Sequence, residues 1–243
     1  MRFVQGTSIA HQVGVANGQP SATPQPWSLK SLIRVIVLSR TYRLSSHSSS
    51  AAERLDSANE LYWRMNMRRL EVEALRDSML SVAGRLTFDR PDGIQVAGTG
   101  GKGRWGVTRS LLDIDAPCRT VYLPVLRSLV PEMYSTFDFP DPNQINGRRD
   151  VTTVAPQTLF LMNSDFSART ASATAERVLA DVRDNEERVR VLYLRLLGRL
   201  PDRNEIRGAL DFLNQLSANT SERSRWATLT QALMICGEFR TLL

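Results

Sequence analysis

The sequence predicts a mainly α-helical, irregular domain with long surface loops and at most a small pair of strands. Apolar residues recur at helical spacing in several segments, capping residues stand where those segments begin and end, and Pro residues punctuate the centre of the chain. With 243 residues, of which 42% are hydrophobic and 23% charged, the chain can bury a sizeable core. We expect a single helical domain over residues 27–243, preceded by a disordered lead-in over residues 1–26.

The first predicted helix begins after Ser28, which is a suitable N-cap residue. Its apolar residues follow the 3-and-4 spacing of a buried stripe, and we expect it to end before the Ser-rich stretch 45–50. The stripe consists of Leu29, Leu32, Ile33, Ile36 and Val37.

A second helical pattern extends from Asn59 to Ala83, with Gly84 placed to end it in a left-handed conformation. Charged residues one turn apart, such as Arg69 and Glu73, are expected to form solvated pairs on its outer face. Its apolar residues fall into two pieces, the first with Leu61, Tyr62, Met65 and Met67 and the second with Leu70, Val72, Leu75, Met79, Leu80 and Val82.

A Gly-rich segment follows, in which Gly98, Gly100 and Gly103 match the spacing G-x-G-x-x-G. That spacing suits a nucleotide pyrophosphate only between a strand and a helix. Here a short strand candidate, Ile94–Ala97, precedes the loop and no periodic helix follows it. We interpret the segment as a mobile loop.

The central stretch alternates between apolar and polar residues over Thr120–Leu126, which predicts a half-buried strand that could pair with Ile94–Ala97. Pro131 is then expected to open a short helix. Another short helix is expected around Leu159–Met162, where Asn163 and Ser164 end it and cap the next one. The apolar side of the helix after Pro131 consists of Met133, Tyr134 and Phe137.

The last third of the chain gives the clearest helical signal. Gly198 is expected to end one helix, and Asp202 with Glu205 has the spacing of a capping box that starts the next. A final helix is expected from about Ser221. The predicted core positions are Val189, Leu192, Tyr193, Leu196, Leu197, Ile206, Leu210, Leu213, Leu216, Trp226, Leu229, Leu233 and Met234.

The formal net charge of +6 is concentrated at the N-terminus, because residues 1–52 carry five basic residues and no acid. The rest of the chain is nearly balanced, and acids are interleaved with its Arg residues. Proteins that bind duplex DNA through a folded surface usually carry a basic patch on the domain itself. The charge pattern therefore makes nucleic-acid binding the weaker hypothesis, confined to the N-terminal segment.

Metal and cofactor sites are not predicted for this chain. Cys118 and Cys236 lie far apart and outside any C-x-x-C or C-x-x-C-H pattern, so buried thiols are favoured over a disulfide between them. His11 and His47 are the only histidines, which argues against a zinc site or a His-based catalytic triad. No apolar run reaches the roughly 18–20 residues of a membrane span, and no secretory signal is recognisable.

If the domain has a ligand site, we predict it where the sequence FDFPDPN meets GRRD. Asp138 and Asp141, held close together by prolines, would perturb each other so that one serves as a general acid. Arg148 and Arg149 would donate to a carboxylate, sulfate or phosphate. The alternative is structural, with Asp–Arg pairs that fasten two loops over the helical core. The remaining predicted lining residues are Tyr122, Arg127, Gln157 and Asn163.

Six blocks of sequence, taken in order, resemble the C-terminal domain of a family of large, mostly planctomycete proteins known as domain of unknown function fifteen fifty-three. The resemblance covers residues 27–243 and implies export or a periplasmic location, with haem c held in a separate cytochrome-c-like domain upstream. This chain has neither an export signal nor C-x-x-C-H, so we expect it to be a fragment of such a protein. The blocks are WSLKSLIRVIVLSRTYRLSS, NELYWRMNMRRLEVEALRDSMLSVAGRL, VYLPVLR, FDFPDPN, NGRRDVTTVAPQTLFLMNSDF and VLYLRLLGRLPDRNE.

Three functional hypotheses follow. The absence of a catalytic signature, together with the resemblance, favours a non-enzymatic binding or scaffolding module with a haem-bearing domain or protein as partner. An enzyme or ligand-binding domain for an anionic or carbohydrate-type substrate at the Asp and Arg loops is the second. Weak nucleic-acid binding by the basic N-terminal segment is the third.

Overall fold

The computed structural model describes residues 27–90, 115–123, 125, 127, 130–216 and 219–242. The predicted lead-in, the Gly-rich loop and the strand candidate Ile94–Ala97 lie outside these residues. The chain divides into two compact units, one formed by Met1–Arg68 with Thr241–Leu243 and one formed by Arg69–Arg240. We call them the N-terminal unit and the main unit and describe each by itself. The fold is mainly α-helical, as predicted.

In the N-terminal unit, helix α1 (Leu29–Leu38) begins as the sequence predicts, because the Ser28 hydroxyl accepts a hydrogen bond from the Ser31 amide. The predicted stripe is not buried, however, and no residue of α1 is. Helix α2 (Ser50–Leu55), which the sequence reading missed, and the turns after it leave the apolar face of α1 exposed.

The prediction of a helix through residues 59–67 is wrong. Asn59 and Tyr62 have φ angles of 56° and 53°, which lie in the left-handed region and break a right-handed helix. The side-chain Nδ2 of Asn59 instead donates to the Arg64 carbonyl at 2.9 Å. The Asp56 carboxylate accepts from the amide of Leu61 at 2.8 Å. Side chain to backbone bonds of this kind compete successfully with helix formation.

In the main unit, helix α3 (Val72–Val82) matches the second predicted piece, and Gly84 ends it with φ 70°. The predicted strand is wrong over its first three residues, because Thr120–Tyr122 forms the 3-10 helix η3, and residues 124 and 126 of the prediction lie outside the described residues. The amide of Thr120 donates to the Asp77 carboxylate, so a side chain takes the bond that a strand partner would have supplied. Among the described residues, the strands that pair are the two-residue segments β1 (Arg68–Arg69) and β2 (Thr241–Leu242), of which only Arg69 belongs to the main unit.

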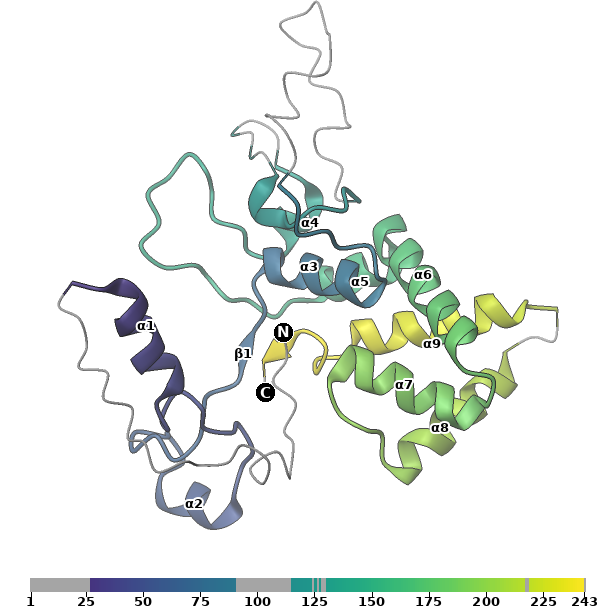
Figure 1. Ribbon diagram of the computed structural model, residues 1–243, viewed down its shortest axis with the longest axis horizontal. Helices are drawn as coiled ribbons and strands as arrows, with labels where there is room; N and C mark the ends of the chain where they lie inside the picture. The colour runs from purple at the N-terminus through teal and green to yellow at the C-terminus, as the bar shows by residue number, and fades with distance from the viewer. Residues whose placement is uncertain are drawn as a thin grey trace, which may run out of the picture. The chain divides into compact units, whose positions relative to one another are not determined.

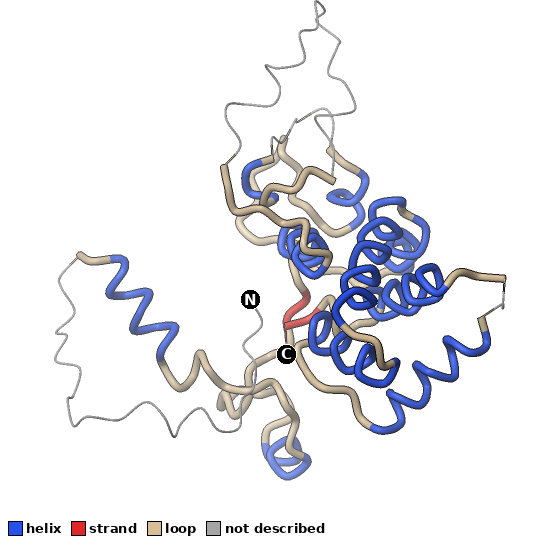
Figure 2. The backbone as a smooth tube through the Cα atoms, turned by 45° about the vertical axis from the view of Figure 1, so that its right-hand side comes forward, coloured by secondary structure: helices blue, strands red, loops and turns tan. Residues whose placement is uncertain are grey.

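Helices α4 (Glu132–Thr136) and α5 (Ala155–Asn163) flank the loop that carries both Asp residues and two of the Arg residues of the predicted site, drawn tan between them in Figure 2. Pro131 stands at the N-cap of α4, as the sequence indicates. Ser164 ends α5 and caps α6 (Asp165–Asp181) by accepting from the Ser167 amide. The loop is therefore anchored at both ends by short helices.

The C-terminal helices follow their sequence signals closely. Helix α7 (Asn185–Leu197) ends at Gly198 with φ 72°, and α8 (Arg203–Gln215) starts with the capping box of Asp202 and Glu205. Helix α9 (Glu222–Ile235) begins after Ser221 and makes its most extensive helix contact with α6. The two helices cross each other in Figure 1.

Small side chains on α6 allow α9 to approach closely. Thr174 and Ala175 of α6 and Thr230 of α9 are fully buried. The Thr174 hydroxyl donates to the Thr170 carbonyl and the Thr230 hydroxyl to the Trp226 carbonyl, so these buried polar groups are satisfied within their own helices. Each large apolar side chain buried in the core of the main unit contributes about 1.5–3 kcal/mol to folding. They include Leu75, Met79, Leu80, Met133, Phe137, Leu161, Phe166, Val178, Leu192, Leu196, Trp226, Met234 and Phe239.

Candidate functional site

The Asp138 carboxylate is the centre of a polar cluster between the loop and the start of α3. It accepts hydrogen bonds from the amide and the hydroxyl of Thr152, at 2.9 and 2.8 Å, and forms an ion pair with Arg69. Gln157, fully buried on α5, accepts from Arg69 at 2.8 Å. Asp138 has φ 59°, so a left-handed backbone position is held in place by these contacts.

The environment of Asp138 keeps its side chain ionised. Burial raises the pKa of this carboxyl, but hydrogen bonds from the Thr152 amide, from Arg69 and from the Thr152 hydroxyl, with the charge of Arg69, lower it more, so the net shift is downward. A general acid needs the opposite shift. Asp141 is exposed and accepts from the amide and side chain of Asn143, at 2.9 and 3.1 Å. The two carboxylates therefore have different partners.

Arg149 forms its ion pair with a glutamate of α3 and not, as the sequence suggested, with an aspartate of the loops. Its Nη1 and Nη2 atoms donate to the two Glu73 carboxylate oxygens at 2.7 and 2.8 Å, and Nη1 lies 3.3 Å from Glu71. Its guanidinium also lies over the Phe139 ring, 5.6 Å from the centroid. Glu73 is thus not a solvated partner of Arg69, as we expected, but fastens the loop to α3.

Arg76, which the sequence analysis did not single out, is completely buried in the structure. It donates to the Cys118 carbonyl and the Thr120 hydroxyl, both at 3.0 Å, and also to the Ala116 carbonyl. The signal was available, because position 76 lies one turn after Val72 and belongs to the apolar stripe of α3. A charged residue at such a position indicates a buried polar contact.

The other predicted site residues do not join these clusters. Tyr122, Arg127 and Arg148 are exposed, and Asn163 donates to the Leu159 carbonyl within α5. Asn163 also borders an open hollow of about 360 Å³ between α4 and α5. The hollow is lined by Glu132, Thr136, Pro156, Leu159, Phe160, Asn163 and Ser164.

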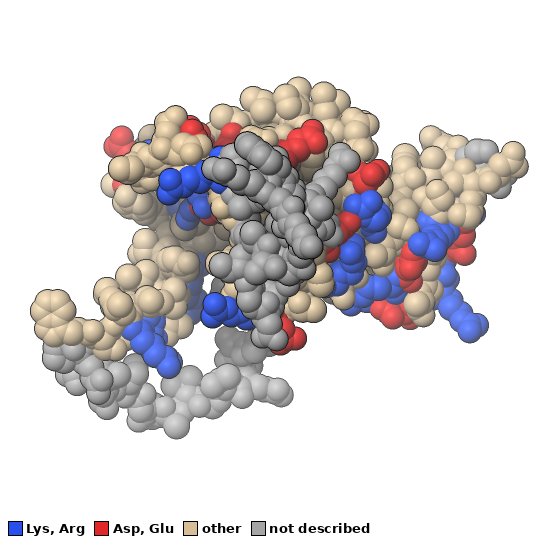
Figure 3. Space-filling model, turned by 90° about the horizontal axis from the view of Figure 1, so that it is seen from above, with Lys and Arg blue, Asp and Glu red and all other residues tan. Residues whose placement is uncertain are grey.

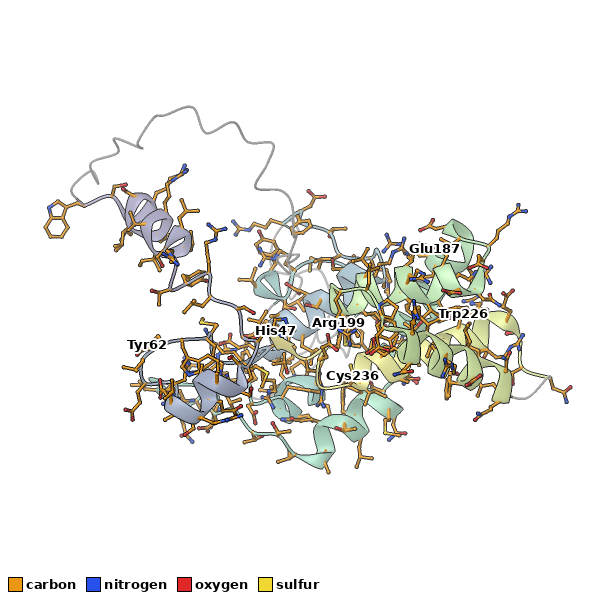
Figure 4. The ribbon with its side chains drawn as sticks, turned by 90° about the horizontal axis from the view of Figure 1, so that it is seen from below. His47, Tyr62, Glu187, Arg199, Trp226 and Cys236 are labelled. Carbon is orange, nitrogen blue, oxygen red and sulfur yellow. The ribbon has the colours of Figure 1, made fainter. Side chains whose placement is uncertain are left out.

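A second ion-pair network joins the C-terminal helices. Arg199 donates to both oxygens of Glu205 at 2.6 and 2.8 Å and to Glu238 at 2.7 and 2.9 Å, and it lies over the Tyr193 ring. In Figure 4, Arg199 and Cys236 lie toward one end of these helices and Trp226 toward the other. The hydrogen bonds that Arg199 donates to Glu205 and Glu238 raise the pKa of its guanidinium, so this cation is permanent.

Three of these contacts are arginine–carboxylate pairs that join segments distant in the sequence: Arg69 with Asp138, Arg149 with Glu73 and Arg199 with Glu238. Among the described residues, no group of three or more His, Cys, Asp or Glu side chains could hold a metal ion. No helix in the described ranges has the length and hydropathy that a bilayer crossing requires. The pairs define a helical domain whose loops are fastened to its core by ion pairs.

Comparison with known proteins assigns this domain to a family. Residues 22–213 match the family described as PSD1, protein of unknown function (DUF1553), and the chain belongs to that family. The resemblance noted in the sequence is thereby confirmed for the domain. No curated protein and no solved structure matches the chain.

Proposed function

We propose that this chain is a non-enzymatic binding or scaffolding module whose partner is a haem-bearing c-type cytochrome domain. One observation carries the proposal: two acids and two arginines around the loop between α4 and α5 are engaged with each other rather than free for catalysis. Asp138 is paired with Arg69 and Glu73 with Arg149, and both carboxyls have lowered pKa values. The haem-bearing partner comes from the family resemblance of the sequence.

Helix α1 supplies a surface for such a partner. Its apolar side chains are exposed, Leu29 at 74% and Ile33 at 58%. Contiguous apolar surface of this kind on one element is typical of protein interaction sites. Lys30 and Arg34 lie one turn apart and outside the apolar stripe, so a substitution at Arg34 changes charge without removing a residue of the stripe.

The test is binding of the full chain to a purified c-type cytochrome domain, followed by haem absorbance in the bound fraction. We expect the wild-type chain to retain the cytochrome, Ile33→Asp to lose it, and Arg34→Asp to keep most of it. Failure of the wild-type chain to bind any tested cytochrome would overturn the proposal that its partner is a c-type cytochrome. Equal binding by Ile33→Asp and the wild-type chain would overturn the assignment of the α1 face as the binding surface.

A second proposal is a ligand site for a carbohydrate-type molecule in the hollow between α4 and α5. It is favoured by a lining that combines the Phe160 ring with the side chains of Glu132, Thr136 and Asn163. Saturation-transfer NMR with glucose, galactose and N-acetylglucosamine tests it. We expect a signal that Asn163→Ala weakens, and no signal with any of the three sugars would reject it.

Nucleic-acid binding through the basic N-terminal segment stays a prediction. In the view of Figure 3, basic and acidic side chains are interspersed over the C-terminal helices, so that face offers no basic stripe to support it. Binding of a 20-base-pair duplex should fall steeply with salt and disappear when residues 1–52 are deleted. Binding that persists after the deletion would exclude the segment.

A further inference from the structure

Two arginines lie next to each other where the main unit begins and ends. Arg69 precedes α3 and Arg240 follows α9, and the Leu70 amide donates to the Arg240 carbonyl at 2.7 Å. That backbone bond makes residues 69 and 240 neighbours although most of the sequence separates them. The Arg240 amide donates in turn to the Gly237 carbonyl at 3.1 Å, which fixes the chain direction after α9.

The two guanidinium groups differ in their compensation. Arg69 is paired with Asp138, and its side chain is only 11% exposed. Arg240 forms no side-chain hydrogen bond or ion pair with the part of the chain that the structure describes. The Nε atoms of both residues are buried without a hydrogen-bond partner. Two cationic donors therefore lie close together, and the one carboxylate that pairs with Arg69, Asp138, also accepts from Thr152.

This arrangement is costly for Arg240. Burial lowers the pKa of its guanidinium, Cys236 acts in the opposite direction, and the positive charge of Arg69 lowers it further, so the net shift is downward. Buried donors without acceptors add a desolvation cost to the repulsion between the two cations. An acceptor with negative charge would remove both costs at once.

We propose that Arg69 and Arg240 form a binding site for a small oxyanion. Guanidinium groups donate two parallel hydrogen bonds to the planar or tetrahedral oxygens of carboxylates, sulfate and phosphate. The oxyanion would accept from Arg240 and from N–H groups of Arg69 that Asp138 and Gln157 do not use. The site is separate from the Arg149 and Glu73 contacts and does not depend on the binding function proposed above.

The experiment is thermal unfolding of the full chain at pH 7 in sodium phosphate, sodium sulfate or sodium acetate, each compared with sodium chloride at equal ionic strength. Chloride reports general screening of the two cations. A bound oxyanion raises the melting temperature beyond that, by an amount that grows with the logarithm of its concentration. Phosphate and sulfate with no acetate response would indicate a tetrahedral anion, and a response to all three a general oxyanion site.

Substitutions separate a binding site from a structural arginine. We expect Arg240→Gln to melt at or above the wild-type temperature in chloride, because it removes the repulsion, and to lose the extra effect of phosphate. Arg240→Lys keeps the charge but not the fork, and should retain a weaker phosphate effect. Arg225→Gln is the matched control, because Arg225 also has a buried Nε without a partner and lies on α9.

The proposal is overturned if every oxyanion acts only as chloride does, or if Arg240→Gln responds to phosphate as the wild-type chain does. It is equally overturned if Arg240→Gln lowers the melting temperature by the same amount in chloride and in phosphate, since that result assigns Arg240 a purely structural role.

Discussion

Arg149 and Glu73 form a forked ion pair, in which Nη1 and Nη2 of Arg149 each donate to one carboxylate oxygen of Glu73, at 2.7 and 2.8 Å. The two residues are 76 positions apart in the chain. This contact fastens the loop between α4 and α5 to α3. Because the two side chains are 33% and 26% exposed, solvent weakens the pair without removing it.

Arg149→Ala should destabilise the main unit by about 1–2 kcal/mol, since it removes a forked ion pair and the contact with Phe139. Urea unfolding measures the change. Arg148→Ala is the matched control: its side chain is exposed and forms no ion pair with a described residue, so its effect should stay within about 0.5 kcal/mol. Equal losses from the two substitutions would contradict the contact.

Asp138 should make stability depend on pH at the acid end. Its pKa in the folded chain lies below the ordinary value of 3.8, so its contribution is complete above about pH 4 and is lost as the pH falls through the folded value. Asp138→Asn, which tolerates the left-handed backbone, removes this contribution. The stability difference between the wild-type chain and Asp138→Asn should therefore shrink below pH 4. A difference that stays constant from pH 6 to pH 3 would refute the assignment.

Arg76→Met should cost about 3 kcal/mol or more, because it leaves the carbonyls of Ala116 and Cys118 and the Thr120 hydroxyl without their buried donor. Arg85→Met is the comparison, since the Arg85 side chain is 34% exposed and pairs with Asp115, which lies next to Ala116 in the chain. It should cost less than about 1 kcal/mol in the same urea experiment. A smaller loss for Arg76→Met than for Arg85→Met would show that the buried cation is dispensable.

Gly84→Ala and Gly208→Ala should have opposite effects. At Gly84 the φ angle is 70° and an added Cβ would approach the Arg177 guanidinium to 2.7 Å, so thermal unfolding should show a loss of about 1–2 kcal/mol. Gly208 lies within α8 with open space around it, and Ala there should add about 0.5–1 kcal/mol. Stabilisation by both substitutions would rule out the strained position.

Much of the fold could be read from the sequence because its signals act within one or two turns. The caps at Ser28, Asp202 and Ser221 and the stop at Gly198 all form as predicted. Each depends on atoms only two to four residues away. The apolar periodicity of the C-terminal helices is equally local, and it matches the buried core there.

The candidate site could be predicted only in part. Asp138 and Gln157 do come together, but the Arg69 and Thr152 side chains that hold them were not among the expected residues. Helical spacing predicts contacts at three or four residues, so Glu73 was assigned to its own helix rather than to Arg149. Two-residue strands such as β1 and β2 carry no alternation that a sequence pattern can detect.

The sequence by itself determined the helical class, most helix ends and the family, because propensities, caps and ordered blocks are properties of neighbouring residues. Only the tertiary structure decided which charges meet. Arg76 is buried, Arg149 reaches Glu73 and Arg69 lies beside Arg240 because the loop and the end of α9 return to α3. Chain return over such separations depends on packing of the whole core, which no local pattern encodes.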